Sequence, residues 1–156
     1  MVKLNLQKCI AVFVLVYSVG SPAMSQSLFD SVISVDRAAI TKYELDQRIR
    51  FFKLLKPSNN VEDEARNSLI EDRLKIAAAR RADIQLTPEA LMAAMSDFAK
   101  NSNNNLNQLL DDLAQDGVDE QTFRDYVEAG ITWRQLVRGR FASRANPTEA
   151  EIDRAL

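Results

Sequence analysis

Apolar residues from Lys42 onward recur at intervals of three and four, which is the spacing of a helix that buries one face. Polar loops, prolines and glycines divide the pattern into segments. The pattern predicts five helices, over residues 42–56, 61–82, 88–101, 106–116 and 120–143. Thr148 and Glu151 form a capping box, which predicts that a sixth helix begins there.

The stretch before the first helix has a different pattern. Ser31 to Val35 alternates polar and apolar residues, and Ala39 to Thr41 follows after a short turn. Such alternation is typical of half-buried strands, so the two segments predict a small β-hairpin. Two strands alone are marginal in water and must pack on something helical. The predicted fold is therefore mainly α, one domain of about six helices with a short N-terminal β-hairpin.

Residues that suit helix starts support these boundaries. Thr41 with Glu44 forms a capping box. Thr87 precedes Pro88, an N-cap followed by proline at the first helical position. Asn105 is an N-cap candidate before the next helix. The spacing of apolar residues and the capping residues thus agree on where the helices begin.

Two glycines have specific expected roles. Gly117 follows a predicted helix end, where the left-handed conformation favours glycine. Gly130 lies inside the last long helix, where glycine costs ~1 kcal/mol relative to alanine. We expect close approach of another helix to explain Gly130.

The first 25 residues have the pattern of a secretory signal peptide. Lys3 and Lys8 precede a compact apolar run, residues 10–19, and Ala23 to Ser25 offers the small residues that a signal peptidase reads. The run is about half the ~20 residues of a membrane-spanning helix, which disfavours a retained anchor. We expect cleavage after Ser25, export to the periplasm, no stable membrane insertion afterwards, and a mature domain over residues 26–156.

The composition excludes most catalytic chemistry. The 156-residue chain has no histidine, and its one cysteine, Cys9, lies in the predicted signal peptide. Ser-His-Asp triads, cysteine nucleophiles and His or Cys metal sites are therefore excluded from the mature domain. Several acidic pairs lie in the first turns of predicted helices, where they favour the helix dipole. We expect no enzyme activity, no catalytic residue, no metal and no cofactor.

Arginines gather near the end of the last long helix: Arg134, Arg138, Arg140 and Arg144. A nucleic-acid face is one interpretation of such a cluster. Without the signal peptide, however, the chain has 18 basic and 22 acidic residues, a net charge of −4, and it is exported. Cations near a helix C-terminus also stabilise the dipole. We therefore expect no nucleic-acid partner.

Some apolar side chains exceed what one helical face can bury. The run Phe51, Phe52, Leu54 and Leu55 is the clearest case. Core packing is the usual role of such residues, but any that stay exposed would form a patch for unfolded or partner chains. The candidate residues for binding such polypeptides, here called clients, are Phe51, Phe52, Met92, Met95, Phe98 and Trp133.

Four segments resemble the SurA family of periplasmic chaperones, in the family's order. The stretch "ITKYELDQRI" resembles its hairpin-to-helix entry, and "LIEDRLKIAAARRADIQLTPEAL" is similar to its next segment. The stretch "GVDEQTFRDYVEAGITWRQLVRGR" resembles its long-helix block, and "PTEAEIDRAL" the helix that leads to a parvulin-type prolyl isomerase domain. The resemblance covers roughly residues 31–156.

The resemblance implies an N-terminal chaperone domain without the isomerase domains. Its expected function is that of a periplasmic, ATP-independent holdase for unfolded outer-membrane or other secreted polypeptides. In the family a C-terminal helix packs back on this unit, so self-association through an uncovered apolar face is a further expectation. Two alternatives stay open: the N-terminal fragment of a parvulin-type isomerase continued beyond residue 156, and a non-catalytic assembly or dimerisation module.

Overall fold

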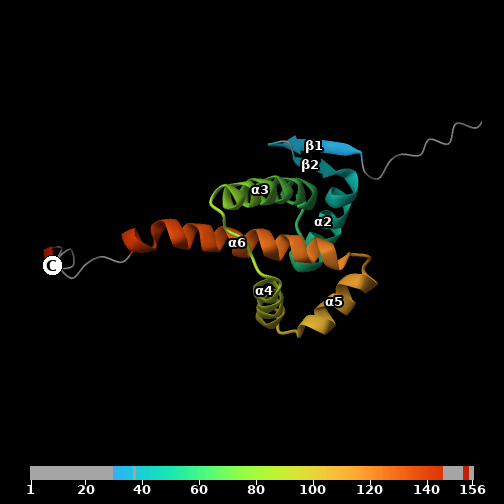
Figure 1. Ribbon diagram of the computed structural model, residues 1–156. Coiled ribbons are helices and arrows are strands. Elements are labelled where there is room, and N and C mark those ends of the chain that lie inside the picture. Colours follow the sequence, from blue (N-terminus) through green and yellow to red (C-terminus); the bar gives the residue numbers. More distant parts are fainter. Residues whose placement is uncertain (1–29, 37, 146–152, 155–156) are drawn as a thin grey trace, which may run out of the picture.

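The computed structural model describes residues 30–36, 38–145 and 153–154. The elements follow in the order β1 (Ser31–Val35), β2 (Ala38–Thr41), α2 (Lys42–Leu55), α3 (Val61–Arg81), α4 (Pro88–Asn101), α5 (Leu106–Gln115) and α6 (Glu120–Ala145) (Figure 1). The mainly α fold with a short hairpin is confirmed. Of the predicted sixth helix only Asp153 and Arg154 are described, both helical. The predicted signal peptide lies outside the described residues.

The two strands form an antiparallel hairpin that rests on the helices. Ile33 pairs with Ile40, whose side chain is fully buried. The guanidinium of Arg73, in α3, donates to the carbonyl oxygen of Ala39 at 3.3 Å. The capping box at the start of α2 is confirmed: the Thr41 hydroxyl accepts from the backbone N–H of Glu44, whose carboxylate accepts from the backbone N–H of Thr41. The hairpin is thus held to the helices where the chain enters α2.

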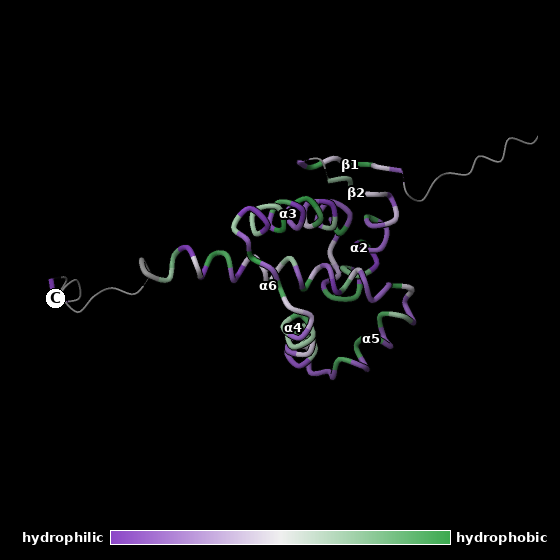
Figure 2. The backbone as a smooth tube through the Cα atoms, viewed as in Figure 1, coloured by the Kyte–Doolittle hydropathy of each residue, from purple (hydrophilic) through white to green (hydrophobic). Residues whose placement is uncertain are grey.

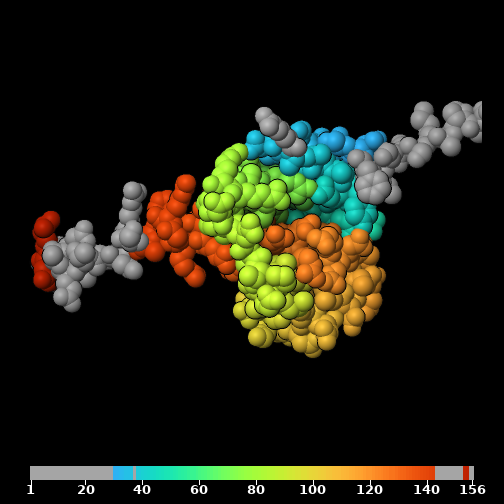
Figure 3. Space-filling model, viewed as in Figure 1, coloured from blue at the N-terminus to red at the C-terminus, as the bar shows by residue number. Residues whose placement is uncertain are grey.

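α6 is the helix on which the others pack. It has 26 residues and is about 39 Å long at 1.5 Å per residue. It runs across the molecule with α3 and the hairpin on one side and α4 and α5 on the other (Figure 1). Its C-terminal end extends beyond the other elements, which the space-filling view shows plainly (Figure 3). One part of α6 therefore belongs to the core and another lies free of it.

Aromatic rings from three helices meet in the core. Phe51 of α2 lies 5.4 Å from Tyr126 of α6, and Phe98 of α4 lies 5.2 Å from Phe123 of α6, both measured between ring centroids. The edge-to-face geometry of these pairs adds to the stabilisation that burial of the rings provides.

Apolar and polar residues alternate along each helix, as the predicted single buried face requires, and Figure 2 shows this alternation along the chain.

The same backbone motif ends three of the helices. The second residue after each helix end has positive φ: Asp83 (52°), Asn103 (56°) and Gly117 (71°). In each case a second N–H closes the motif, for example Val118 donating to the carbonyl of Leu113 at 2.9 Å. The left-handed conformation expected for Gly117 is confirmed. At Asp83 and Asn103 short polar side chains tolerate the conformation that glycine adopts freely.

A buried hydroxyl in α6 has no partner. Thr132 is buried, and its Oγ1 makes no hydrogen bond among the described residues. Leaving a buried hydroxyl unpaired costs roughly 1–3 kcal/mol, whereas valine has the same shape without the polar atom.

We therefore expect Thr132→Val to raise the free energy of unfolding by about 1 kcal/mol, measured by urea denaturation. Thr122→Val is the matched control, because the Thr122 hydroxyl does have a partner, the Gln47 amide oxygen at 3.5 Å. A loss of stability in Thr132→Val would contradict the prediction.

Candidate functional site

A cleft of about 370 Å³ opens between α3, α4 and α6. Its lining divides into an apolar part and a polar part. The apolar lining residues, with the adjacent glycine, are Ala94, Phe98, Val127, Gly130 and Ile131. The polar ones are Asp72, Lys75, Asp97, Asn101, Tyr126 and Arg134. We call this feature the α3/α4/α6 cleft. The lining thus combines apolar side chains, which can contact a ligand's apolar groups, with polar and charged ones that can orient it.

Gly130 keeps the cleft open. A Cβ atom built at this position would meet no atom within 4 Å, so no other helix approaches it. The expectation of close helix packing at Gly130 is wrong. The physical reason is that this side of α6 faces the cleft and not a neighbouring helix. Gly130 therefore contributes empty space where any other residue would place a side chain.

One lining residue of the cleft, Asp72, belongs to a buried ion pair. Arg48 of α2 and Asp72 of α3 have exposed side-chain fractions of 1% and 8%, and Arg48 Nη1 donates to Asp72 Oδ2 at 2.8 Å. Arg48 Nη1 also donates to Ser68 Oγ at 2.6 Å. The guanidinium carbon lies 5.0 Å from the ring centroid of Tyr126, in α6. The pair thus joins three helices and fixes one wall of the cleft.

Burial has the largest effect on the pKa of Asp72. Removal from water raises the pKa of Asp72 above its ordinary value, although the adjacent Arg48 guanidinium opposes the shift. Lys75, whose Nζ lies 3.9 Å from Asp72 Oδ1, opposes it further from the rim of the cleft. The two cations therefore offset part of the rise that burial causes in the pKa of Asp72.

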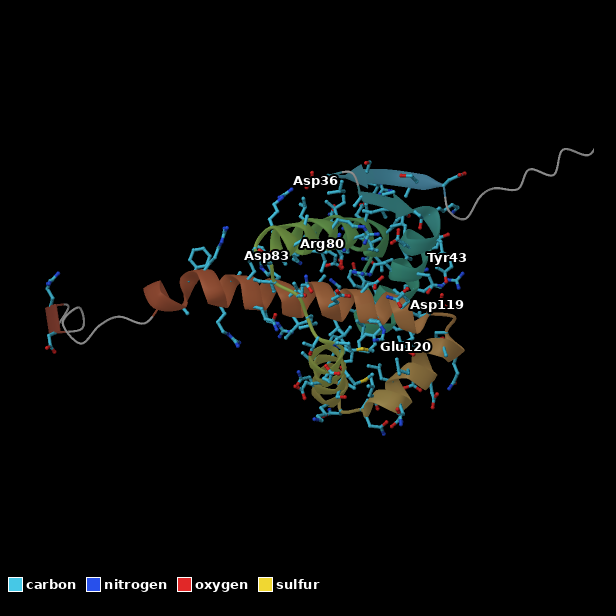
Figure 4. The ribbon with its side chains drawn as sticks, viewed as in Figure 1. Asp36, Tyr43, Arg80, Asp83, Asp119 and Glu120 are labelled. Atoms are coloured by element: carbon cyan, nitrogen blue, oxygen red, sulfur yellow. The ribbon has the colours of Figure 1, made fainter. Side chains whose placement is uncertain are left out.

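A second buried polar group positions the start of α6. Gln47 donates from Nε2 to the carbonyl of Gly117 at 3.1 Å, and its Oε1 accepts from the N–H of Asp119 at 2.8 Å. The Tyr43 hydroxyl donates to the Asp119 carboxylate, and the two labelled side chains lie together where α2 meets the start of α6 (Figure 4). That hydrogen bond raises the pKa of Tyr43 above its ordinary value. These bonds hold the α5–α6 turn against α2.

The six candidate client-binding residues separate into two groups. Phe51, Phe52 and Met95 are core residues, with exposed fractions of 0%, 3% and 0%. They offer no surface to a client, because aromatic and apolar neighbours from α2, α4 and α6 enclose them. The expectation that they line an exposed groove is corrected accordingly.

The other three candidates reach the surface in different places. Phe98 is half-buried and lines the cleft. Trp133 is 40% exposed and precedes Arg134 in sequence, but it is not among the residues that line the cleft. Met92 is 45% exposed, but helical periodicity places it on the opposite side of α4 from Ala94. Whether any of them binds a client stays a prediction.

The sequence pattern had indicated other cleft residues only indirectly. Tyr126, Val127 and Gly130 lie on α6 at helical spacing and line the cleft together. Ile131 and Arg134 belong to it as well. The signal that could have found them is the spacing of three and four from Val127.

Other kinds of site are not found in the described part of the chain. Residues 30–36, 38–145 and 153–154 contain no group of three or more Cys, Asp or Glu side chains that could hold a metal ion. Nor does any helix among them have the length and apolar character needed to cross a membrane.

Comparison with known proteins identifies the family. The sequence pattern of the SurA N-terminal domain matches residues 30–137, which include the hairpin, α2 to α5 and most of α6. The chain therefore belongs to the SurA N-terminal domain family. The matched family is a domain named for a chaperone and not for an enzyme.

Relatives carry the name Chaperone SurA. The protein of Alcanivorax borkumensis is 28% identical over 155 residues, covering 94% of this chain and 36% of the relative. That of Nitrosococcus oceani has the same identity and coverage. A Xylella fastidiosa relative is 30% identical over 139 residues, covering 84% of this chain and 30% of its own length. The chain thus spans about a third of the length of these relatives.

The buried ion pair generates a stability prediction. Arg48→Met would leave Asp72 buried without its main partner, and breaking a buried pair in this way costs ~3–5 kcal/mol. We expect that loss in urea denaturation at pH 7. The double variant Arg48→Met/Asp72→Leu should regain most of it, because it removes the stranded charge.

The loss should also depend on pH. Without Arg48 the pKa of Asp72 rises further. A carboxyl group whose pKa is higher in the folded state than in the unfolded state favours folding at low pH, and its contribution to the free energy of unfolding is lost as the pH rises. The deficit of Arg48→Met should therefore shrink as the pH falls towards 4. A deficit below about 1 kcal/mol at pH 7 would contradict the role given to the pair.

Proposed function

We propose that the protein is a periplasmic, ATP-independent chaperone module that holds unfolded outer-membrane proteins. The observation that carries the proposal is the α3/α4/α6 cleft, whose lining combines apolar with charged side chains and which is open above Gly130. Membership of the SurA N-terminal domain family supports it, as do relatives named as chaperones. The pattern of residues 1–25 supports the compartment.

The proposed mechanism is weak and reversible contact. The cleft is near the lower end of the ~300–1000 Å³ typical of ligand pockets, so it takes one or two side chains of an extended chain at a time. Phe98, Val127 and Ile131 would contact apolar client side chains. Lys75, Asp97 and Arg134 would keep the complex solvated at the rim. Clients bound in this way are kept from aggregating with one another, and they dissociate without ATP hydrolysis.

The alternatives remain distinct from this proposal. An N-terminal fragment of a parvulin-type isomerase is supported by the longer relatives, and the coding region after Leu156 would decide it. An assembly or dimerisation module would form a stable oligomer that ignores unfolded clients.

The first test is suppression of aggregation. A denatured outer-membrane β-barrel protein is diluted into buffer with and without the purified full chain, and light scattering is recorded. We expect suppression at a near-equimolar ratio. If a sample that circular dichroism shows to be helical does not suppress aggregation, the holdase proposal is wrong.

A variant that fills the cleft tests its location. Gly130→Leu places a side chain in the open space of the cleft, and replacing a helical glycine stabilises the helix by up to ~1 kcal/mol. We expect the variant to stay folded and to lose at least half of the suppression. Gly139→Leu is the matched control, because it makes the same change on α6 at a glycine that is also open but does not line the cleft. Equal suppression by the two variants would show that clients bind elsewhere.

The mass of the exported chain tests the proposed compartment. When the full chain is expressed in a Gram-negative host, we expect a periplasmic species that begins at Gln26 and lacks residues 1–25. A species of full mass in the membrane fraction would favour a retained anchor instead.

A further inference from the structure

The free end of α6 carries arginine and aromatic side chains on one face. Trp133, Arg134, Arg138, Arg140 and Phe141 are all exposed, with Trp133 at 40% and Phe141 at 48%. At about 100° per residue these five positions fall within roughly 160° of the helix circumference. The opposite side has Thr132 and Leu136, which are buried, and Gln135, Gly139 and Ala142, which are small or uncharged. We call the first face the arginine–aromatic face.

The positive charge of this face has no ion-pair partner in the part of the chain that the structure describes. No ion pair involving Arg134, Arg138 or Arg140 is present among the described residues. Residues 129–145 contain no Asp or Glu. The helix dipole acts only within the last turn, whereas these arginines lie five to eleven residues before the end at Ala145. Helix stabilisation therefore does not account for them.

The face continues the α3/α4/α6 cleft. Arg134 lines the cleft together with Gly130 and Ile131, and the next turns of α6 carry the face away from the body (Figure 3). From Gly130 to Phe141 the helix rises about 16 Å, the length of roughly five residues of extended chain. A client segment seated in the cleft can therefore run along the free end of α6.

We propose that the arginine–aromatic face extends the client site and selects acidic segments of unfolded polypeptides. The inference rests on the proposed holdase function and names the charge of its clients. Guanidinium groups bind carboxylates bidentately, and the exposed indole and phenyl rings cover the apolar side chains between them. A basic segment would meet uncompensated like charge over the same length.

The arrangement fits a polypeptide better than a lipid surface. A helix that lies in a membrane interface separates an apolar face from a cationic face. Here the arginines and the two rings share one face, so the rings cannot enter the acyl region without the charges. Interleaved charges and rings match an extended chain whose own acidic and apolar side chains are interleaved.

Peptide binding tests the selection. Two fluorescein-labelled peptides of about ten residues share their apolar residues, and one has three Glu where the other has three Lys. Anisotropy titration of the full chain should give a Kd about tenfold lower for the acidic peptide at low salt, since exposed ion pairs are individually weak. The preference should fall as salt is raised.

Matched variants locate the selection. Arg138→Gln/Arg140→Gln should reduce the preference to below about threefold and leave the helicity unchanged, because both side chains are exposed and unpaired. Lys53→Gln/Arg80→Gln removes the same charge from α2 and α3, where neither residue is in a described ion pair, and should keep the preference.

Each outcome is decisive. Equal affinity for both peptides, with aggregation still suppressed, would overturn the charge selection alone. Binding of neither peptide and no suppression would overturn the holdase proposal. No peptide preference, together with arginine-dependent binding to vesicles of phosphatidylcholine and phosphatidylglycerol or to a DNA oligonucleotide, would assign the face to that polyanion instead.

Discussion

The structure depends on one ion pair that is closed off from water. Arg48 and Asp72 are 24 positions apart in sequence and come from different helices, and a tyrosine of a third helix covers the guanidinium. Placements of α2 and α3 that separate the two buried charges are disfavoured, because each charge would then be left without its partner. α6 then packs where its Tyr126 can reach both Arg48 and the Phe51 ring. The packing of three helices is thus fixed by polar geometry as well as by apolar burial.

Two residues that hold the core together also line the cleft. Asp72 and Tyr126 line the cleft and also contact Arg48. The wall of the cleft on α3 therefore cannot shift away from α2 without separating the buried charges. Its opposite wall on α4 is held differently, by Leu91, Met95 and Phe98 packed in the apolar core. A binding site with one rigid and one softer wall suits clients of many sequences.

The starts of the helices could be predicted from the sequence, but the exposure of individual side chains could not. Thr41, Thr87 and Asn105 begin helices because a short side chain caps the nearest N–H groups, which is a matter of a few neighbouring residues. Met92 and Met95 lie on one predicted helix, yet the first is exposed and the second fully buried. Helical spacing groups Met95 with Leu91 and Phe98, but the exposed fraction of each side chain depends on where α6 lies. The Arg48–Asp72 pair was missed for the same reason, because each residue alone is typical of a solvated helix face.

The contacts that join α4 to the rest of the domain determine how its packing changes with temperature. The side-chain hydrogen bonds and ion pairs described for α4 all stay within α4 and its caps, so only apolar contacts join it to α6. Apolar attraction weakens on cooling, whereas the buried polar bonds that join α2, α3 and α6 do not share that dependence. Cooling should therefore loosen α4 before the other three helices. The amide hydrogens of α4 would then exchange with solvent by a local opening, at temperatures where those of α2 and α3 exchange only by global unfolding.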